Sequence, residues 1–163
     1  MSAHVATIRA AILAKLQAVP GIGLVYDRER YAKEERAFRD LYTQAVEING
    51  EDADVVHGWW FRRTASIERS LGVGRNLDIS TWAIRGYLGF DDARNTEHEF
   101  EALIEAMRDA FRADPTLGGA TEQSPLRDSN NQDGLQLVET SPVMLAGVLC
   151  HSAVLTFTTW SYL

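Results

Sequence analysis

The sequence contains a single cysteine, Cys150, and no long apolar run. One cysteine excludes a disulfide within the chain, so nothing in it requires an oxidising compartment. No stretch approaches the about 20 apolar residues of a membrane helix. The first residues lack the basic and apolar regions of a signal peptide. We therefore expect a cytoplasmic protein with no membrane partner.

Basic residues are also few, because 16 Lys and Arg stand against 23 Asp and Glu, for a net charge of −7. Binding along a nucleic-acid backbone needs clustered basic side chains, so this balance argues against specific nucleic-acid binding. The chain has 163 residues, of which 45% are hydrophobic and 24% charged. These values are typical of one globular domain, which we expect to span residues 1–163.

Motifs that carry chemistry are missing as well. Ala102 stands where a zinc-protease helix would place its second histidine after His98. Cys150 and His151 are neighbours on an expected strand, so they point to opposite faces and cannot pair as nucleophile and base. The loop at 72–74 lacks the Lys-Ser or Lys-Thr pair of a phosphate-binding loop. The sequence thus predicts no catalytic residue, no metal and no cofactor.

Two segments have the apolar period of amphipathic helices. The first covers residues 3–19 and ends at Pro20, which cannot continue a helix. The second covers residues 96–112. It opens with Thr96 and, three residues later, Glu99, a spacing that predicts a capping box. We expect both helices to bury one apolar stripe.

Strands are expected between these helices and after the second one. Asn49-Gly50 is a strong hairpin signal. Alternation from Val55 onward places Trp59, Phe61, Ala65 and Ile67 on one apolar face. The expected strands cover residues 23–28, 41–48, 55–68, 77–90, 135–139 and 148–159.

The charged stretch at 29–40 predicts a short helix or an ordered loop, and the polar stretch at 118–134 predicts a long mobile loop. The order of elements predicts an α+β fold, in which an antiparallel or mixed β-sheet carries two main α-helices on one face.

Six residues are candidates for protein contacts. Trp60 interrupts the polar face of its strand, and Trp160 lies near the end of the last one; aromatic residues are enriched at interfaces. Several arginines concentrate on the central strands, where they form either a salt-bridged sheet surface or a contact face for an acidic partner. The six candidates are Arg28, Arg30, Trp60, Arg62, Arg85 and Trp160.

The order of elements also matches a known pattern across nearly the whole chain. An opening helix of the type Ile8–Leu13 leads into Pro20–Arg28, and long strands follow. A helix, a polar loop and a closing strand complete the pattern. In size and order the chain resembles the tail terminator family (tail completion or minor tail proteins) of long-tailed bacteriophages. The segments that carry the resemblance are 8–13, 20–28, 59–61, 82–87, 95–111 and 150–157.

This resemblance implies a structural virion protein of a bacteriophage or prophage, with no substrate and no enzymatic activity. Family members assemble as homohexameric rings on the last ring of the tail tube, end tube growth and provide a surface for head attachment. The implied partners are further copies of the chain, the tail tube protein and a head–tail connector or neck protein. The implied location is the virion tail or neck, and the host cytoplasm during assembly.

Two other functions stay open. The aromatic residues could line a pocket between sheet and helix, which would make the chain a small-ligand binding module. Scattered residues such as Arg85, Asp91 and His98 could instead form an enzyme site that one sequence does not reveal.

Overall fold

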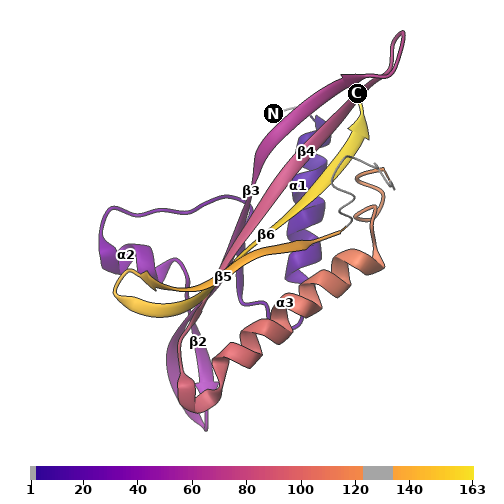
Figure 1. Cartoon of the computed structure of the whole chain (residues 1–163). Coiled ribbons are helices and arrows are strands. Elements are labelled where there is room, and N and C mark those ends of the chain that lie inside the picture. Colours follow the sequence, from indigo (N-terminus) through magenta and orange to yellow (C-terminus); the bar gives the residue numbers. More distant parts are fainter. Residues whose placement is uncertain (1–2, 123–133) are drawn as a thin grey trace.

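The computed structural model describes residues 3–122 and 134–163 (Figure 1). Its helices are α1 (Ala3–Gln17), α2 (Glu35–Asp40) and α3 (Thr96–Ala113), with a 3-10 turn, η1 (Asp92–Arg94). Its strands are β1 (Leu24–Tyr26), β2 (Thr43–Ile48), β3 (Glu51–Ser70), β4 (Asn76–Gly89), β5 (Gln136–Leu145) and β6 (Val148–Tyr162).

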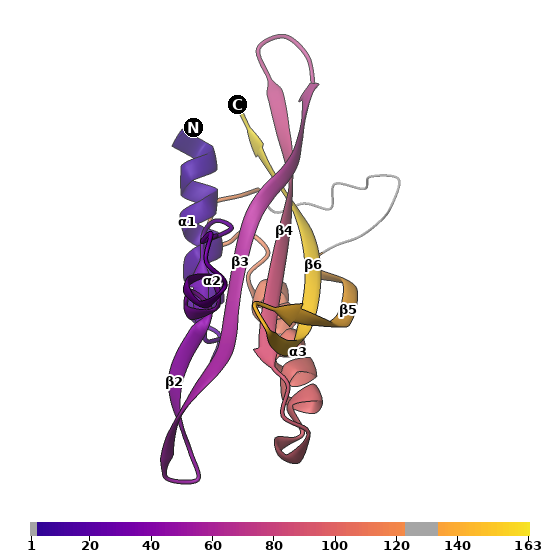
Figure 2. The same ribbon diagram turned by 90° about the vertical axis from the view of Figure 1, so that its left-hand side faces the viewer.

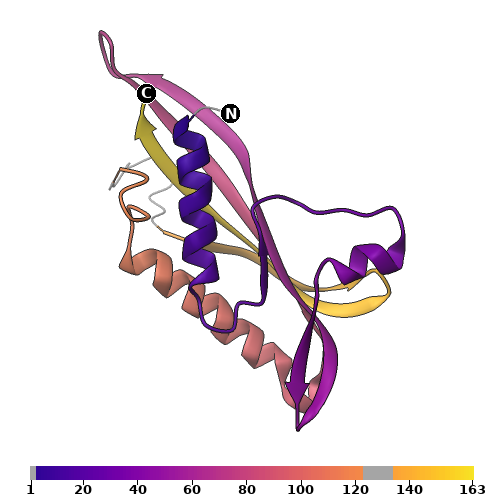
Figure 3. The same ribbon diagram turned by 180° about the vertical axis from the view of Figure 1, so that it is seen from behind.

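The strands form one mixed sheet of six strands in the order β1-β3-β4-β6-β5, and β2 also pairs with β3. Only β1 runs parallel to its neighbour; the other pairs are antiparallel. Both long helices, α1 and α3, lie on the same face of this sheet (Figure 3). The predicted α+β fold with two main helices on one face is therefore confirmed.

The main core fills the space between these two helices and the sheet. Trp59 stacks on Phe100 of α3 with ring centroids 5.5 Å apart, and Trp82 stacks on Phe157 at 6.5 Å. The Trp82 indole N–H donates to Thr159 Oγ1 over 2.8 Å, which satisfies a donor that would otherwise be buried without a partner. The predicted core face of β3 at Trp59 and Phe61 is confirmed.

The opposite face of the sheet carries a second, smaller apolar cluster. Trp60 belongs to it and is only 5% exposed, so its ring packs within this cluster in the free chain. Tyr42 packs edge-on against Tyr87 at 5.6 Å and against Phe38 at 5.7 Å. The segment that includes α2 packs on this cluster through Phe38, Leu41 and Tyr42, while Tyr31 stays exposed.

A β-bulge between Arg63 and Ala65 corrects one expectation. The bulge inserts Thr64 as an extra residue, so the side chains beyond it move to the other face of the sheet. Ala65 and Ile67 therefore leave the face of Phe61, and Ile67 is exposed. Simple alternation fails here because the register between two strands, not the local sequence, sets the face.

The start of α3 also differs from the predicted capping box. Asn95, in the left-handed region at φ 55°, is the N-cap and makes no side-chain cap bond. Thr96 is the first helical residue, and its Oγ1 accepts from the Asp91 N–H over 2.9 Å. Glu99 pairs with Arg94 at 3.5 Å. Most of the expected loop at 118–134 lies outside the described residues.

Gly86 makes the central contact of the main core possible. It stands opposite Trp59 in the β3–β4 register, and the indole lies directly over its backbone. A Cβ at Gly86 would fall 2.1 Å from the Trp59 ring, whereas a Cβ at Gly89 would fall 3.6 Å from the nearest atom, an ordinary contact.

We expect Gly86→Ala to lower the free energy of unfolding by about 1–3 kcal/mol or more, since the indole must shift within a packed core. Gly89→Ala, on the same strand, is the matched control and is expected to be neutral or slightly stabilising. Chemical denaturation of both variants measures the difference, and equal stabilities would contradict this packing.

His57 is a buried histidine at the point where β1 and β2 both meet β3. Its Nδ1 lies 3.3 Å from Gln44 Nε2, while its Nε2 is buried without a hydrogen-bond partner among the described residues. Burial lowers the pKa of His57 below the ordinary value of 6.5. Protonation would place a charge at this buried position, and the attraction of Glu99 offsets the cost of burial only in part.

The free energy of unfolding should therefore fall as the pH drops below 6.5, because the unfolded chain then binds the proton more readily than the folded one. Proton uptake by one such group changes the free energy of unfolding by at most about 1.4 kcal/mol per pH unit. Denaturation measured between neutral and mildly acidic pH should show a smaller decrease in the free energy of unfolding for His57→Gln than for the wild type. His98→Gln, at an exposed position, should show the same fall in the free energy of unfolding as the wild type. A fall in His57→Gln as large as in the wild type would contradict the assignment of this pH dependence to His57.

Candidate functional site

The residues named for a scattered enzyme site do not form one described cluster. Asp91 accepts a hydrogen bond from the Arg94 N–H at the start of η1, and His98 is exposed beside Asn95. Arg85 lies on the middle of β4, opposite Trp60. No hydrogen bond or ion pair within the described residues joins Asp91, His98 and Arg85.

Cys150 and His151 point to opposite faces of β6, as strand alternation predicts. The Cys150 thiol is buried in the second cluster, where burial raises its pKa to about 11. His151 stacks between Phe90 and Phe100, at 4.3 and 5.9 Å, and its Nε2 lies 2.9 Å from Thr96 Oγ1. Burial lowers the His151 pKa. These contacts hold the start of α3 against the sheet.

Within residues 3–122 and 134–163, no three His, Cys, Asp or Glu side chains lie close enough together to hold a metal ion. No helix in the same part of the chain has both the length and the apolarity to cross a membrane.

The structure brings most of the predicted contact residues to one face of the sheet, opposite the long helices. Trp60 and Arg62 share this face on β3, and the Arg62 guanidinium lies over the Trp60 ring at 5.5 Å. Arg85 stands opposite Trp60 in the register. Arg30 stacks on Tyr26, the β1 partner of Trp60, at 4.9 Å. These arginines and aromatic rings form the central part of what we call the open face, meaning the sheet face that carries neither long helix; residues 38–42 pack on part of it.

The open face continues toward the β3–β4 turn. Alternation along β4 places Ile79 on the same side as Arg85, and Ile79 stands opposite both Ile67 and Trp160. Trp160 is half-buried and packs edge-on against Tyr162 at 5.6 Å. Arg28 is exposed and pairs only with its neighbour Asp27. Five of the six predicted residues thus lie on or beside this face, and the exception is Arg28.

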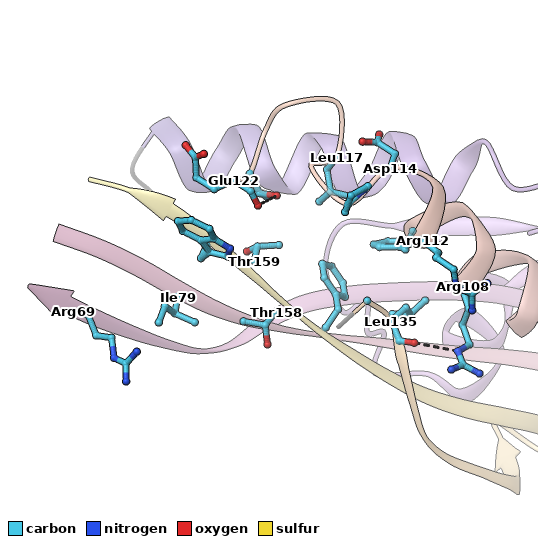
Figure 4. Close-up of a pocket in the computed structure, with 16 residues that line it drawn as sticks. Arg69, Ile79, Arg108, Arg112, Asp114, Leu117, Glu122, Leu135, Thr158 and Thr159 are labelled. Carbon is cyan, nitrogen blue, oxygen red and sulfur yellow. Dashed lines mark hydrogen bonds between the residues drawn. The ribbon is translucent and has the colours of Figure 1, made fainter. Parts of the chain in front are cut away.

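A cavity of about 370 Å³ lies along the free edge of β6. Figure 4 shows Asp114 and Leu117 on one side of that strand and Arg69 and Ile79 on the other. Arg108 closes one end by donating to the Leu135 carbonyl over 3.1 Å. The cavity has apolar walls and cationic side chains at its rim, features that single-sequence reasoning missed because its walls come from four separate elements.

Most large exposed apolar side chains gather in two regions of the molecule, and Tyr31 stands apart from both. One group lies around the β3–β4 turn and the end of β6; the other lies along β5, from its first residues to the β5–β6 turn, and on the adjoining ends of β4 and β6. Figure 2 shows the β3–β4 turn extending beyond α1 and past the end of β6. The first group is Ile67, Leu71, Val73, Tyr162 and Leu163, and the second is Phe90, Leu137, Val138, Met144 and Leu149.

These two groups have the character of contact surfaces, because single exposed apolar residues are common but clustered ones mark interaction sites. No family model matches the sequence, and no curated protein is significantly similar to it.

Substitutions at Trp60 and Trp160 should distinguish a ring that stabilises the fold from a ring at the surface. Trp60→Ala removes a buried ring from the second cluster and should lower the free energy of unfolding by about 3–5 kcal/mol. Trp160→Ala acts on a half-buried ring near the end of β6 and should cost less. Denaturant titration measures both, and a larger loss for Trp160→Ala would contradict this placement.

Proposed function

We propose that this chain is a structural assembly protein of a bacteriophage or prophage, which caps the tail tube as a homohexameric ring. In this role it ends tube elongation and provides the surface to which the head attaches. Its partners are further copies of itself, the tail tube protein and a head–tail connector or neck protein. It acts in the virion neck, through shape and charge, as the family resemblance implies.

One observation carries the proposal: most of the large apolar side chains that the core leaves out are collected in two separate regions of a single sheet. A subunit of a ring needs two different surfaces, each complementary to the other on its neighbour. A chain whose biology involved only one small ligand would not need two separated apolar surfaces. The open face, with Arg62 and Arg85 beside apolar residues, supplies a third surface for the tube or the connector.

The charge of the chain fits the same role. A ring at the end of a tail tube surrounds the path of the DNA, and a net charge of −7 per chain disfavours adhesion to a passing polyanion.

The cavity at the edge of β6 supports a second candidate, a small-ligand binding module. Its rim carries Arg69, Arg108 and Arg112, and the Phe111 and Phe157 rings form part of its wall, so a small anion with an apolar body would suit it. This site lies away from the packed centre of the main core at Trp82 and Phe100. A thermal-shift screen of small organic anions would promote this candidate if one of them stabilised the protein specifically.

The test of the main proposal uses tail tubes assembled from the tube protein of the same phage or prophage. Added protein should bind at tube ends, stop elongation and appear as a terminal ring by electron microscopy. Arg62→Glu with Arg85→Glu should weaken this capping, because both arginines lie on the open face.

The matched control reverses two exposed basic residues outside the β-sheet, Lys33→Glu with Arg36→Glu, and should cap tubes like the wild type. Tubes that grow to the same lengths with and without the protein, with no density at their ends, would contradict the proposal.

A further inference from the structure

A groove of about 390 Å³ runs between α3 and the edge strand β5. Its floor is apolar and includes Phe100, Ile104 and the ring of His151. One wall is β5, from Leu137 to Pro142, and the other is a line of glutamates on α3. The groove therefore combines an apolar floor with an acidic rim.

The acidic rim is only partly neutralised. Glu105 pairs with Arg108 at 2.9 Å, but Glu101 and Glu97, one and two turns earlier, make no ion pair within the described residues. Both are exposed. Because Glu97, Glu101 and Glu105 are spaced by four residues, they lie along one face of the helix beside the groove.

The apolar floor extends beyond the groove toward the β5–β6 turn. Phe90 and Leu137 belong to the groove itself and are exposed. Met144 and Leu149, paired across β5 and β6, continue the surface and are also exposed. An occupant of this surface must bring apolar side chains together with positive charge.

The β3–β4 hairpin carries that combination. Leu71 and Val73 form its tip, and Val73 is fully exposed. Between 62 and 75 the chain has four arginines and one acidic residue, Glu68, so this segment is basic within an acidic protein. Every residue from Arg62 to Arg75 is exposed.

The β3–β4 turn lies at one end of the molecule, far from the first turns of α3, which border the groove (Figure 1). One chain therefore cannot fill its own groove, whereas successive copies can join head to tail through two different surfaces. A hairpin is narrow and keeps its own backbone hydrogen bonds, so its tip can enter a groove without leaving buried polar groups unpaired.

We infer that the β3–β4 hairpin of one copy docks in the groove between α3 and β5 of a second copy. Leu71 and Val73 meet the apolar floor, while Arg69 and Arg75 face Glu97 and Glu101 across the rim. This contact rests on the proposed ring assembly and names the surfaces that would build it.

Two charge-reversed variants test the contact. The hairpin variant carries Arg69→Glu and Arg75→Glu, and the groove variant carries Glu97→Arg and Glu101→Arg. Each variant places like charges on the two surfaces, so each alone should associate at least about ten-fold more weakly than the wild type. Light scattering across a concentration series, with and without tube ends, measures the assembled mass.

An equimolar mixture of the two variants should restore assembly, because each acidic hairpin then meets a basic groove and each basic hairpin an acidic one. Lys33→Glu with Arg36→Glu has the same change in charge as the hairpin variant and should assemble like the wild type. Thermal unfolding confirms that every variant is folded, so that lost assembly reports on the contact.

The outcomes separate this inference from the proposed function. If the wild type assembles and both reversals assemble equally well, or their mixture fails to recover, the hairpin–groove contact is wrong and the capping function survives. If the reversals abolish tube capping but leave the ring intact, the hairpin contacts the tube instead of a neighbouring copy. A wild type that stays monomeric in solution and on tube ends would overturn both.

Discussion

A mismatch of length governs this structure: the β3–β4 ribbon is longer than the helices that bury it. β3 has 20 residues, which span roughly 66 Å, while the 18 residues of α3 span roughly 27 Å. The helices can therefore seal only part of one sheet face. Trp59 over Gly86 and Trp82 against Phe157 lie in the sealed part, and from Arg62 onward every residue of β3 is exposed.

The side chains that the helices leave uncovered lie in defined regions of the molecule. The bulge at Thr64 turns Ile67 away from the core side, and the turn beyond it places Leu71 and Val73 in solvent. At the other end, β5 ends the sheet next to α3, whose glutamates border a groove. These two surfaces are the ones that we propose for contacts with further copies of the chain.

The sequence predicts the parts of this arrangement that depend on neighbours along the chain. Both long helices follow from a local apolar period, and the hairpin at Asn49-Gly50 follows from residues that accept positive φ. The side of the sheet on which Ile67 lies cannot be predicted in this way, because it depends on the register between β3 and β4. The burial of Trp60 does not follow from its own strand, since the other side chains of its cluster come from segments that are distant in the sequence, among them Phe38, Tyr87 and Leu145. The groove was invisible because it joins α3 to a strand that begins more than twenty residues after the helix ends.

Amide hydrogen exchange, compared between the free and the assembled chain, tests most directly whether the β3–β4 hairpin and the groove between α3 and β5 are the functional surfaces. The account predicts that exchange slows on assembly at 62–75 and at 137–142, the edge of β5, while α2 exchanges at the same rate in both states. Protection confined to other segments, with these two exchanging as fast in the assembly as in the free chain, would contradict it.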